Sequence, residues 1–239
     1  MDFNSFKEEM ILNLNEIDLN LTDEQIRNFY VFMNLLIEKN KVMNLTGITE
    51  PKEVILKHFI DSLTALKYMN GNNTVIDVGT GAGFPGLPLK IAEGSLEITL
   101  LDSLNKRINF LNEVIENTGL DNIKTIHGRA EDFGRNTECR EMYDVAISRA
   151  VAPLNILLEY MLPFVKVGGK CICMKGNNCD DEIENAKNAI KKLGGEIEKI
   201  DKFSLPNSDN NRTILIIKKV KKTDKQYPRN AGIPTKKPL

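Results

Sequence analysis

The chain is poor in the residues that build metal and redox sites. It has no tryptophan, two histidines and four cysteines among 239 residues. The cysteines are Cys139, Cys171, Cys173 and Cys179. No two of them have the C-x-x-C spacing, so we expect no zinc site and no metal. The alternation of Cys171 and Cys173 in an apolar run is typical of small buried side chains that stay reduced in the cytosol.

Long apolar runs are also missing. No stretch approaches the length that spans a bilayer, and the first ten residues, MDFNSFKEEM, carry acids where a secretory signal needs a basic region. We therefore expect a cytoplasmic protein without a membrane partner. The length of 239 residues suits one large domain with a small addition.

A strong overall charge is the third absence, because the formal net charge is only −1. The charge is nevertheless uneven. Residues 218–239 contain eight basic side chains and one acid, which leaves a net −8 on the rest of the chain. A basic end on an acidic body indicates either nucleic-acid contact or a solubilising terminus, and composition alone does not separate the two.

The first seventy residues have helical patterns. Thr22 and Gln25 form the S/T-x-x-E/Q spacing of a capping box, and apolar residues then recur at helical intervals to Ile37. A second helix is predicted from Pro51 to Met69, ended by the GNN run at 71–73. Residues 1–70 are therefore expected to form a helical cap, 71–220 the main domain, and 221–239 a basic tail.

Beyond residue 73, strand and helix patterns alternate. Strands are predicted at 74–79, 96–102, 123–128, 143–148 and 169–175. The alternation predicts a doubly wound parallel α/β sheet. Two further strand-like runs, at 194–206 and 211–220, have no helix between them and are expected to pair as antiparallel strands at the sheet edge. This edge pair is the arrangement of a Rossmann-like class I methyltransferase.

The run VIDVGTGAGFPGLPL directly follows the first predicted strand. Its glycines Gly79, Gly81 and Gly83 indicate a backbone that approaches a nucleotide closely. The register from Gly81 satisfies G-x-G-x-x-G, but Gly79 stands at the strand end, where the first tight turn is needed. In the register that starts at Gly79, Phe84 stands where a dinucleotide site has its third glycine. The antiparallel closing pair favours S-adenosylmethionine over a dinucleotide.

Two later segments are candidates for the rest of the nucleoside site. Asp102 ends the second predicted strand, where a carboxylate can accept hydrogen bonds from ribose hydroxyls. After the third strand, GRAEDF places Ala130 with Glu131 or Asp132 where they can frame an adenine edge.

In combination, these motifs make the chain resemble the bacterial small-subunit rRNA guanine-N7 methyltransferases, the glucose-inhibited division protein B family. The matching stretches include NLTGITEPKEVILKHFIDSL, VIDVGTGAGFPGLPLKIA, LLDS, GRAEDF, YDVAISRAVAPL and YPRNAGIPTKKPL. The resemblance implies methyl transfer from S-adenosylmethionine to N7 of a guanine in the decoding-region loop of 16S rRNA. It also implies roles for particular residues: Gly79 and Phe84 line the cofactor site, Asp102, Ser103 and Leu104 form the ribose rim, Ala130 and Glu131 lie by the adenine, and Arg149 lies beside cofactor and target.

Chemistry agrees with that target. Guanine N7 has a lone pair and no proton, so its methylation needs no general base. The sequence shows no obvious general base. Arg149 follows the fourth strand and is the candidate catalytic residue, although a strand-terminal arginine can also serve only to pair with an acid. The roles of His58 and Lys175 stay open. The expected partner is 16S rRNA or the small ribosomal subunit, and the protein is expected to be a monomer. The alternative function is a non-catalytic regulator that binds S-adenosylmethionine or a dinucleotide.

Overall fold

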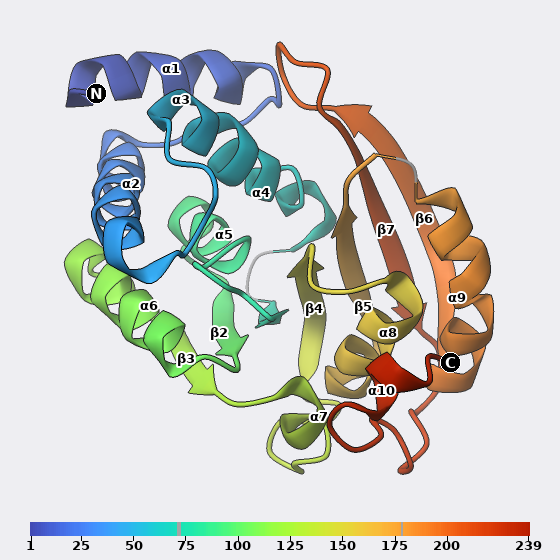
Figure 1. Ribbon diagram of the computed structural model, residues 1–239. Coiled ribbons are helices and arrows are strands. Elements are labelled where there is room, and N and C mark those ends of the chain that lie inside the picture. Colours follow the sequence, from blue (N-terminus) through green and yellow to red (C-terminus); the bar gives the residue numbers. More distant parts are fainter. Residues whose placement is uncertain (71–72, 178) are drawn as a thin grey trace.

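The computed structural model describes residues 1–70, 73–177 and 179–239, and its middle layer is a seven-stranded sheet (Figure 1). The strands are β1 (Thr74–Val78), β2 (Glu97–Asp102), β3 (Ile123–His127), β4 (Tyr143–Arg149), β5 (Val165–Lys175), β6 (Gly195–Ser204) and β7 (Asn211–Lys219). Their order is β3-β2-β1-β4-β5-β7-β6. The first five strands are parallel, and β7 is antiparallel to both β5 and β6. The predicted α/β sheet with an antiparallel last strand is confirmed.

Helices cover both faces of this sheet. The α-helices are α1 (Phe3–Asn15), α2 (Asp23–Met43), α3 (Pro51–Val54), α4 (Asp61–Leu63), α5 (Gly86–Ala92), α6 (Asn105–Thr118), α7 (Ala130–Phe133), α8 (Leu154–Met161), α9 (Asp180–Leu193) and α10 (Ile233–Lys236). A π-helix spans Ile55–Ile60, and 3₁₀ turns span Leu66–Tyr68 and Leu162–Phe164. Figure 1 shows α1 to α6 on one side and α8 to α10 on the other.

Neighbouring residues along each strand point to opposite faces and therefore enter different cores. Val75 and Ile147 belong to the core beneath α1 to α6, whereas Ile76 and Ala146 belong to the core beneath α8 and α9. Residues on both faces are buried, which explains why these strands read as continuous apolar runs.

The N-terminal helices share the first of these cores. Phe32 of α2 lies with its ring centroid 5.2 Å from that of Phe84, which follows the glycine loop, and 6.3 Å from that of Phe110 in α6. The predicted capping box begins α2: the Gln25 N–H donates to Thr22 Oγ1 at 3.2 Å, and the Thr22 N–H donates to Gln25 Oε1 at 2.8 Å. The helical cap is thus packed directly against the glycine loop.

The segment from Pro51 differs from the single regular helix that its pattern predicts. It begins with Pro51 in the first turn of α3, as expected, but widens into the π-helix and ends in a 3₁₀ turn. A π turn leaves backbone groups out of the regular ladder, and the Lys57 carbonyl here accepts a hydrogen bond from Arg149 at 3.0 Å. The predicted break at 71–73 falls mostly outside the described residues.

The sequence pattern also suggests that residues 214–217 form an edge strand, and this is wrong. They lie in β7, which is inserted between β5 and β6, and all four are buried. β6 is the edge strand, as its many exposed side chains indicate. The short turn after β6 lets the chain fold back beside β5, where the uninterrupted apolar run of β7 is covered on both faces.

The C-terminal residues pack against the rest of the protein. β7 is antiparallel, so its end at Lys219 lies near the amino ends of the parallel strands, remote from their carboxyl ends. From there residues 220–239 pass α7 and reach α8, where Figure 1 shows α10. Lys219 itself is fully buried and donates to Leu162 O at 2.6 Å and Thr223 Oγ1 at 2.7 Å. It is a structural lysine and is not available to RNA.

Candidate cofactor and active site

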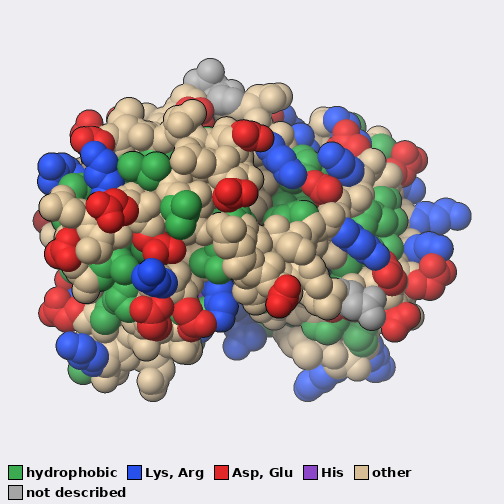
Figure 2. Space-filling view, turned by 90° about the horizontal axis from the view of Figure 1, so that it is seen from above, with side chains coloured by type: hydrophobic (Ala, Val, Ile, Leu, Met, Phe, Trp, Pro, Cys, Tyr) green, Lys and Arg blue, Asp and Glu red, His purple; other side chains and the backbone are tan. Residues whose placement is uncertain are grey.

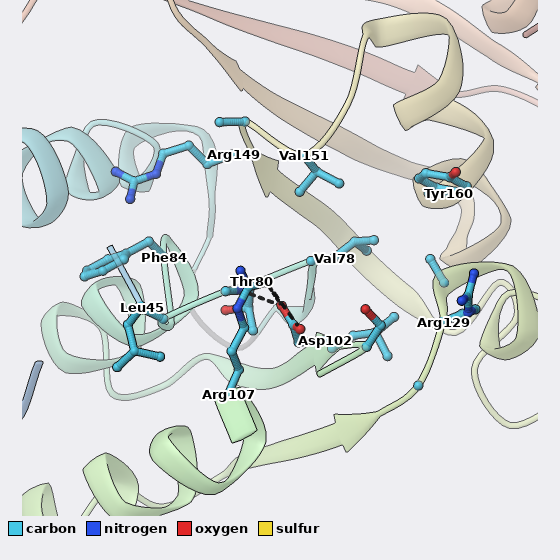
Figure 3. A pocket seen from close by; sticks show the side chains of 18 of the residues that line it. Leu45, Val78, Thr80, Phe84, Asp102, Arg107, Arg129, Arg149, Val151 and Tyr160 are labelled. Atoms are coloured by element: carbon cyan, nitrogen blue, oxygen red, sulfur yellow. Dashed lines mark hydrogen bonds and ion pairs between the residues drawn. The ribbon is translucent and has the colours of Figure 1, made fainter. Parts of the chain in front are cut away.

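A cavity of about 600 Å³ opens at the carboxyl ends of β1, β2 and β4. In Figure 3, Arg149 and Phe84 lie at one end of it, Arg129 and Tyr160 at the other, and Asp102 between them. The lining residues are Leu45, Thr46, His58, Val78, Gly79, Thr80, Gly81, Ala82, Phe84, Leu101, Asp102, Ser103, Arg107, Gly128, Arg129, Ala130, Glu131, Arg149, Ala150, Val151 and Tyr160. Open α/β sheets bind their ligands at this position.

The three alternating glycines have different tasks. All have left-handed backbone angles, with φ of +72° at Gly79, +62° at Gly81 and +97° at Gly83. A Cβ on Gly83 would lie 2.3 Å from a methyl carbon of Leu87, so this glycine permits packing beneath the loop and does not line the cavity. A Cβ on Gly81 would meet nothing within 4 Å. Gly81 therefore leaves open space on the cavity side, as close approach of a ligand requires.

Asp102 joins the glycine loop to the next strand. Its Oδ2 accepts the Gly81 N–H at 2.9 Å and the Arg107 guanidinium at 3.1 Å, while Oδ1 accepts the Leu104 N–H at 2.9 Å. The carboxylate is buried at the cavity wall. Carboxylates at this position of nucleotide-binding sheets accept hydrogen bonds from ribose hydroxyls.

Beneath the loop lies a second acid, Asp77, which sequence reasoning did not single out. Its Oδ2 accepts the Thr80 hydroxyl at 2.7 Å and the Gly86 N–H at 2.8 Å. Its Oδ1 is buried without a hydrogen-bond partner among the described residues. Burial raises the pKa of Asp77 to about 7. The only sequence signal for Asp77 is its place two residues before Gly79.

The residues predicted to lie by the adenine are at the far end of the cavity. Ala130 and Glu131 begin α7 and line the wall, together with Tyr160 of α8. Ser103 also lines the cavity. Leu104 does not: its side chain is 43% exposed, and its contribution at this site is the backbone N–H that Asp102 accepts.

The near end is built around Arg149 at the end of β4. Its guanidinium donates to His58 Nδ1 at 3.0 Å and to Asp61 Oδ2 at 3.3 Å, and lies 5.0 Å above the Phe84 ring. His58 stacks on the same ring, with centroids 4.4 Å apart. Because the guanidinium can only donate, His58 Nδ1 accepts, and Nε2 carries the proton that it donates to Thr46 Oγ1 at 2.8 Å. The helical cap thus orients the candidate catalytic arginine.

Burial, and then the adjacent Arg149 cation, lower the pKa of His58 to about 3. In the unfolded chain His58 takes up a proton below about pH 6.5, whereas in the folded chain it stays neutral, so its contribution to stability is lost as the pH falls from about 6.5 towards 3. We expect the free energy of unfolding of the wild type, relative to His58→Asn, to fall by at most about 3 kcal/mol between pH 7.5 and 4.5. Urea unfolding of both proteins at the two pH values measures this difference. A constant difference would contradict a neutral, buried His58.

The structure brings eight of the ten residues predicted for the site into one cavity. These are Gly79, Gly81, Phe84, Asp102, Ser103, Ala130, Glu131 and Arg149, whereas Gly83 and Leu104 lie outside it. Tyr160 lies in none of the quoted sequence stretches, whereas Leu45 and Val151 lie within NLTGITEPKEVILKHFIDSL and YDVAISRAVAPL but are apolar residues that mark no site by themselves. His58 and Thr46 could have been noticed only as part of the quoted run NLTGITEPKEVILKHF.

The comparisons with known proteins agree with this geometry. The pattern of the GidB family, rRNA small subunit methyltransferase G, matches residues 25–215. Ribosomal RNA small subunit methyltransferase G of Desulforamulus reducens is 54% identical, with 94% of each chain covered. The protein of the same name from Alkaliphilus metalliredigens is 49% identical, covering 94% of this chain and 95% of its own.

Two solved structures share the fold at low sequence identity. M. jannaschii TYW2 in complex with AdoMet gives a TM-score of 0.53 at 17% identity, covering 67% of this chain and 77% of its own. Trm5b from Pyrococcus abyssi gives 0.54 at 17%, covering 74% and 52%. The strand order, the antiparallel β7 and the glycine loop before Asp102 define a class I S-adenosylmethionine-dependent methyltransferase fold. Within that class, the chain belongs to the GidB family of rRNA small subunit methyltransferase G.

Proposed function

We propose that this protein transfers a methyl group from S-adenosylmethionine to N7 of a guanine in the decoding-region loop of 16S rRNA. The observation that carries the proposal is the single cavity that joins the glycine loop and Asp102 to Arg149. The family relationship supports the rRNA substrate, because the relatives named ribosomal RNA small subunit methyltransferase G align with this chain over nearly their whole length. The residues present fit the cofactor: Gly81 leaves open space, and Asp102 and Glu131 offer acceptors for ribose and adenine.

When bound, S-adenosylmethionine supplies an electrophilic methyl group, which guanine N7 can accept directly because N7 has a lone pair and no proton. The residues of this chain then have to align guanine N7 with the methyl group and enclose both, and they do not have to move protons. Arg149 is held by His58, Asp61 and the Lys57 carbonyl, so its remaining N–H groups have a defined direction. They can hold O6 or a phosphate of the target, leaving N7 free.

The two residues whose roles the sequence left open, His58 and Lys175, are both engaged and are not placed to act as a general base. His58 is neutral, but its Nδ1 lone pair accepts from Arg149 and its Nε2 donates to Thr46. Lys175 donates to Ala152 O at 2.7 Å and pairs with Glu182 at 2.7 Å, so it orders the loop after β4. This arrangement supports a reaction that needs no proton transfer, as N7 methylation does.

The alternative, a non-catalytic binding protein, predicts cofactor binding without product. Purified small subunits or 16S rRNA from cells that lack this protein should accept tritiated methyl from S-adenosylmethionine when the protein is added. Mass spectrometry of the digested RNA should locate the label as 7-methylguanine. Binding of S-adenosylmethionine without label in either substrate would contradict the proposal.

Two exposed lysines of the C-terminal segment close to the cavity are expected to contact RNA phosphates. Lys236 and Lys237 lie beside Thr235, whose hydroxyl contacts the cavity residue Tyr160. Lys221 and Lys222 are equally exposed, but follow β7 at the opposite end of the sheet. We expect Lys236→Gln with Lys237→Gln to weaken RNA binding and to reduce its salt slope by about 1.4 to 1.8.

The matched control is Lys221→Gln with Lys222→Gln, which removes the same charge from the same segment. Filter binding at several salt concentrations compares the two variants. Equal effects would contradict a specific role for the cavity-side lysines. Figure 2 shows charges of both signs scattered over the face it presents.

The remaining features of the proposal concern where the protein works. The substrate is proposed to be 16S rRNA, free or within the small ribosomal subunit, and the place of action the cytoplasm. No helix in the described part of the chain is long and apolar enough to cross a membrane. A monomer is proposed, and light scattering at assay concentration tests it. The division at residues 70 and 220 also stays a prediction.

A further inference from the structure

The C-terminal segment, residues 221–239, is fastened to the body by arginines of the connection after α7. Arg140 donates to the carbonyls of Thr223 and Tyr227, both at 2.7 Å. Arg135 donates to the Pro228 carbonyl at 2.7 Å. Carbonyl acceptors that converge on guanidinium groups fix the path of a chain better than side-chain contacts alone, because the backbone itself is held.

A buried ion pair continues this attachment. Glu159 of α8 is fully buried, and its carboxylate accepts the Arg229 backbone N–H at 2.7 Å and the Arg229 guanidinium at 2.6 Å. A buried carboxylate needs such partners, so the segment and α8 depend on each other. Glu159 directly precedes Tyr160, which lines the cavity.

Beyond Arg229 the segment contacts the cavity wall itself at two points. The Gly232 N–H donates to Glu131 Oε1 at 3.2 Å, and Thr235 Oγ1 lies 3.2 Å from the Tyr160 hydroxyl. Gly232 has φ of +80°, a backbone conformation that favours glycine. Within the described residues, Glu131 Oε2 has no hydrogen-bond partner, so one carboxylate oxygen is held by the segment and the other stays available.

We propose that the C-terminal segment is a part of the cofactor site: by holding Glu131 and Tyr160 it positions the acceptor that recognises the adenine amino group. This rests on the proposed use of S-adenosylmethionine. Gly232 and Thr235 are positioning residues, because they act through Glu131 and Tyr160 and do not reach the cavity themselves. The segment therefore has a role besides supplying positive charge.

The test measures recognition of the base by calorimetry, using S-adenosylhomocysteine and its inosine analogue, which has an oxo group in place of the amino group. Gly232→Pro removes the N–H and excludes the required φ, and should lower affinity for S-adenosylhomocysteine about tenfold or more while reducing its preference over the inosine analogue. Thr235→Val removes one hydrogen bond and should lower that affinity about fivefold. The control, Lys221→Gln with Lys222→Gln, should stay within about twofold of wild type.

The outcomes separate this proposal from the function on which it rests. If Gly232→Pro and Thr235→Val keep wild-type affinity and wild-type base preference, the segment has no part in the cofactor site. If the wild type binds neither ligand, the proposed function itself fails. Should Gly232→Pro lower the melting temperature by more than a few degrees, Thr235→Val decides, since it changes one surface contact. A loss of affinity for both ligands alike would overturn the role in recognising the amino group.

Discussion

Replacing Gly81 by valine is expected to abolish measurable binding of S-adenosylmethionine, an affinity loss of about 100-fold or more. Gly81 lines the cavity, and a Cβ at this position has nothing within 4 Å. Valine would fill the space that the ligand needs, and its φ of +62° is a conformation that β-branched residues avoid. The strain could also disturb the Gly81 N–H bond that orients Asp102. Calorimetric titration measures the affinity, and circular dichroism checks the fold.

Gly119 offers a matched control for this experiment. It ends α6 with φ of +61°, and a Cβ there also meets nothing within 4 Å. Gly119→Val therefore introduces the same side chain and similar backbone strain, of about 1–2 kcal/mol, at a position that does not line the cavity. It should lose stability but keep its affinity. Equal loss of affinity in the two variants, or full affinity in Gly81→Val, would contradict the assignment of the cavity.

The sheet was predictable from the sequence because its signals are local. Strand patterns and the capping box at Thr22 depend on neighbours within a few residues, and the structure has both. The position of β7 was not predictable in the same way. Its run of apolar residues is consistent with an edge or an interior strand, and only the pairing of β5 on one side and β6 on the other makes it interior.

The site was predictable where one loop supplies several residues, as in the glycine loop and in 130–131. Tyr160 enters the cavity only through the packing of α8, which no short motif records. The burial of Lys219 among the C-terminal lysines could not be predicted for a similar reason. Composition counts Lys219 as a surface cation, whereas the fold encloses it between Leu162 and Thr223. Long-range placement is the information that the sequence pattern lacks.

Arg149→Ala is expected to lower the single-turnover rate of methyl transfer about 100-fold to 1,000-fold, the range found when one preorganised donor is removed from an active site. Its guanidinium lines the cavity and is held on three sides, by the Lys57 carbonyl, His58 and Asp61. Alanine leaves the glycine loop and Asp102 in place, so affinity for S-adenosylmethionine should change by less than about tenfold. RNA affinity should fall only modestly, because one residue is a small part of an interface with a polyanion. Arg149→Lys keeps the charge without the planar fork and should recover only part of the rate.

Arg212→Ala distinguishes this role from a merely structural ion pair. Arg212 bonds the same carboxylate, Asp61, with Nε to Oδ1 at 3.0 Å, but it does not line the cavity. If Arg149 served only to neutralise Asp61, removing either arginine would reduce the rate similarly. We expect the single-turnover rate of Arg212→Ala at saturating RNA to stay within about tenfold of wild type. Arg149 still neutralises Asp61 in this variant, and Arg149 keeps its hydrogen bonds to the Lys57 carbonyl and to His58. Comparable losses in the two variants, together with equal drops in melting temperature, would assign Arg149 to structure and leave alignment of the guanine to other residues of the cavity.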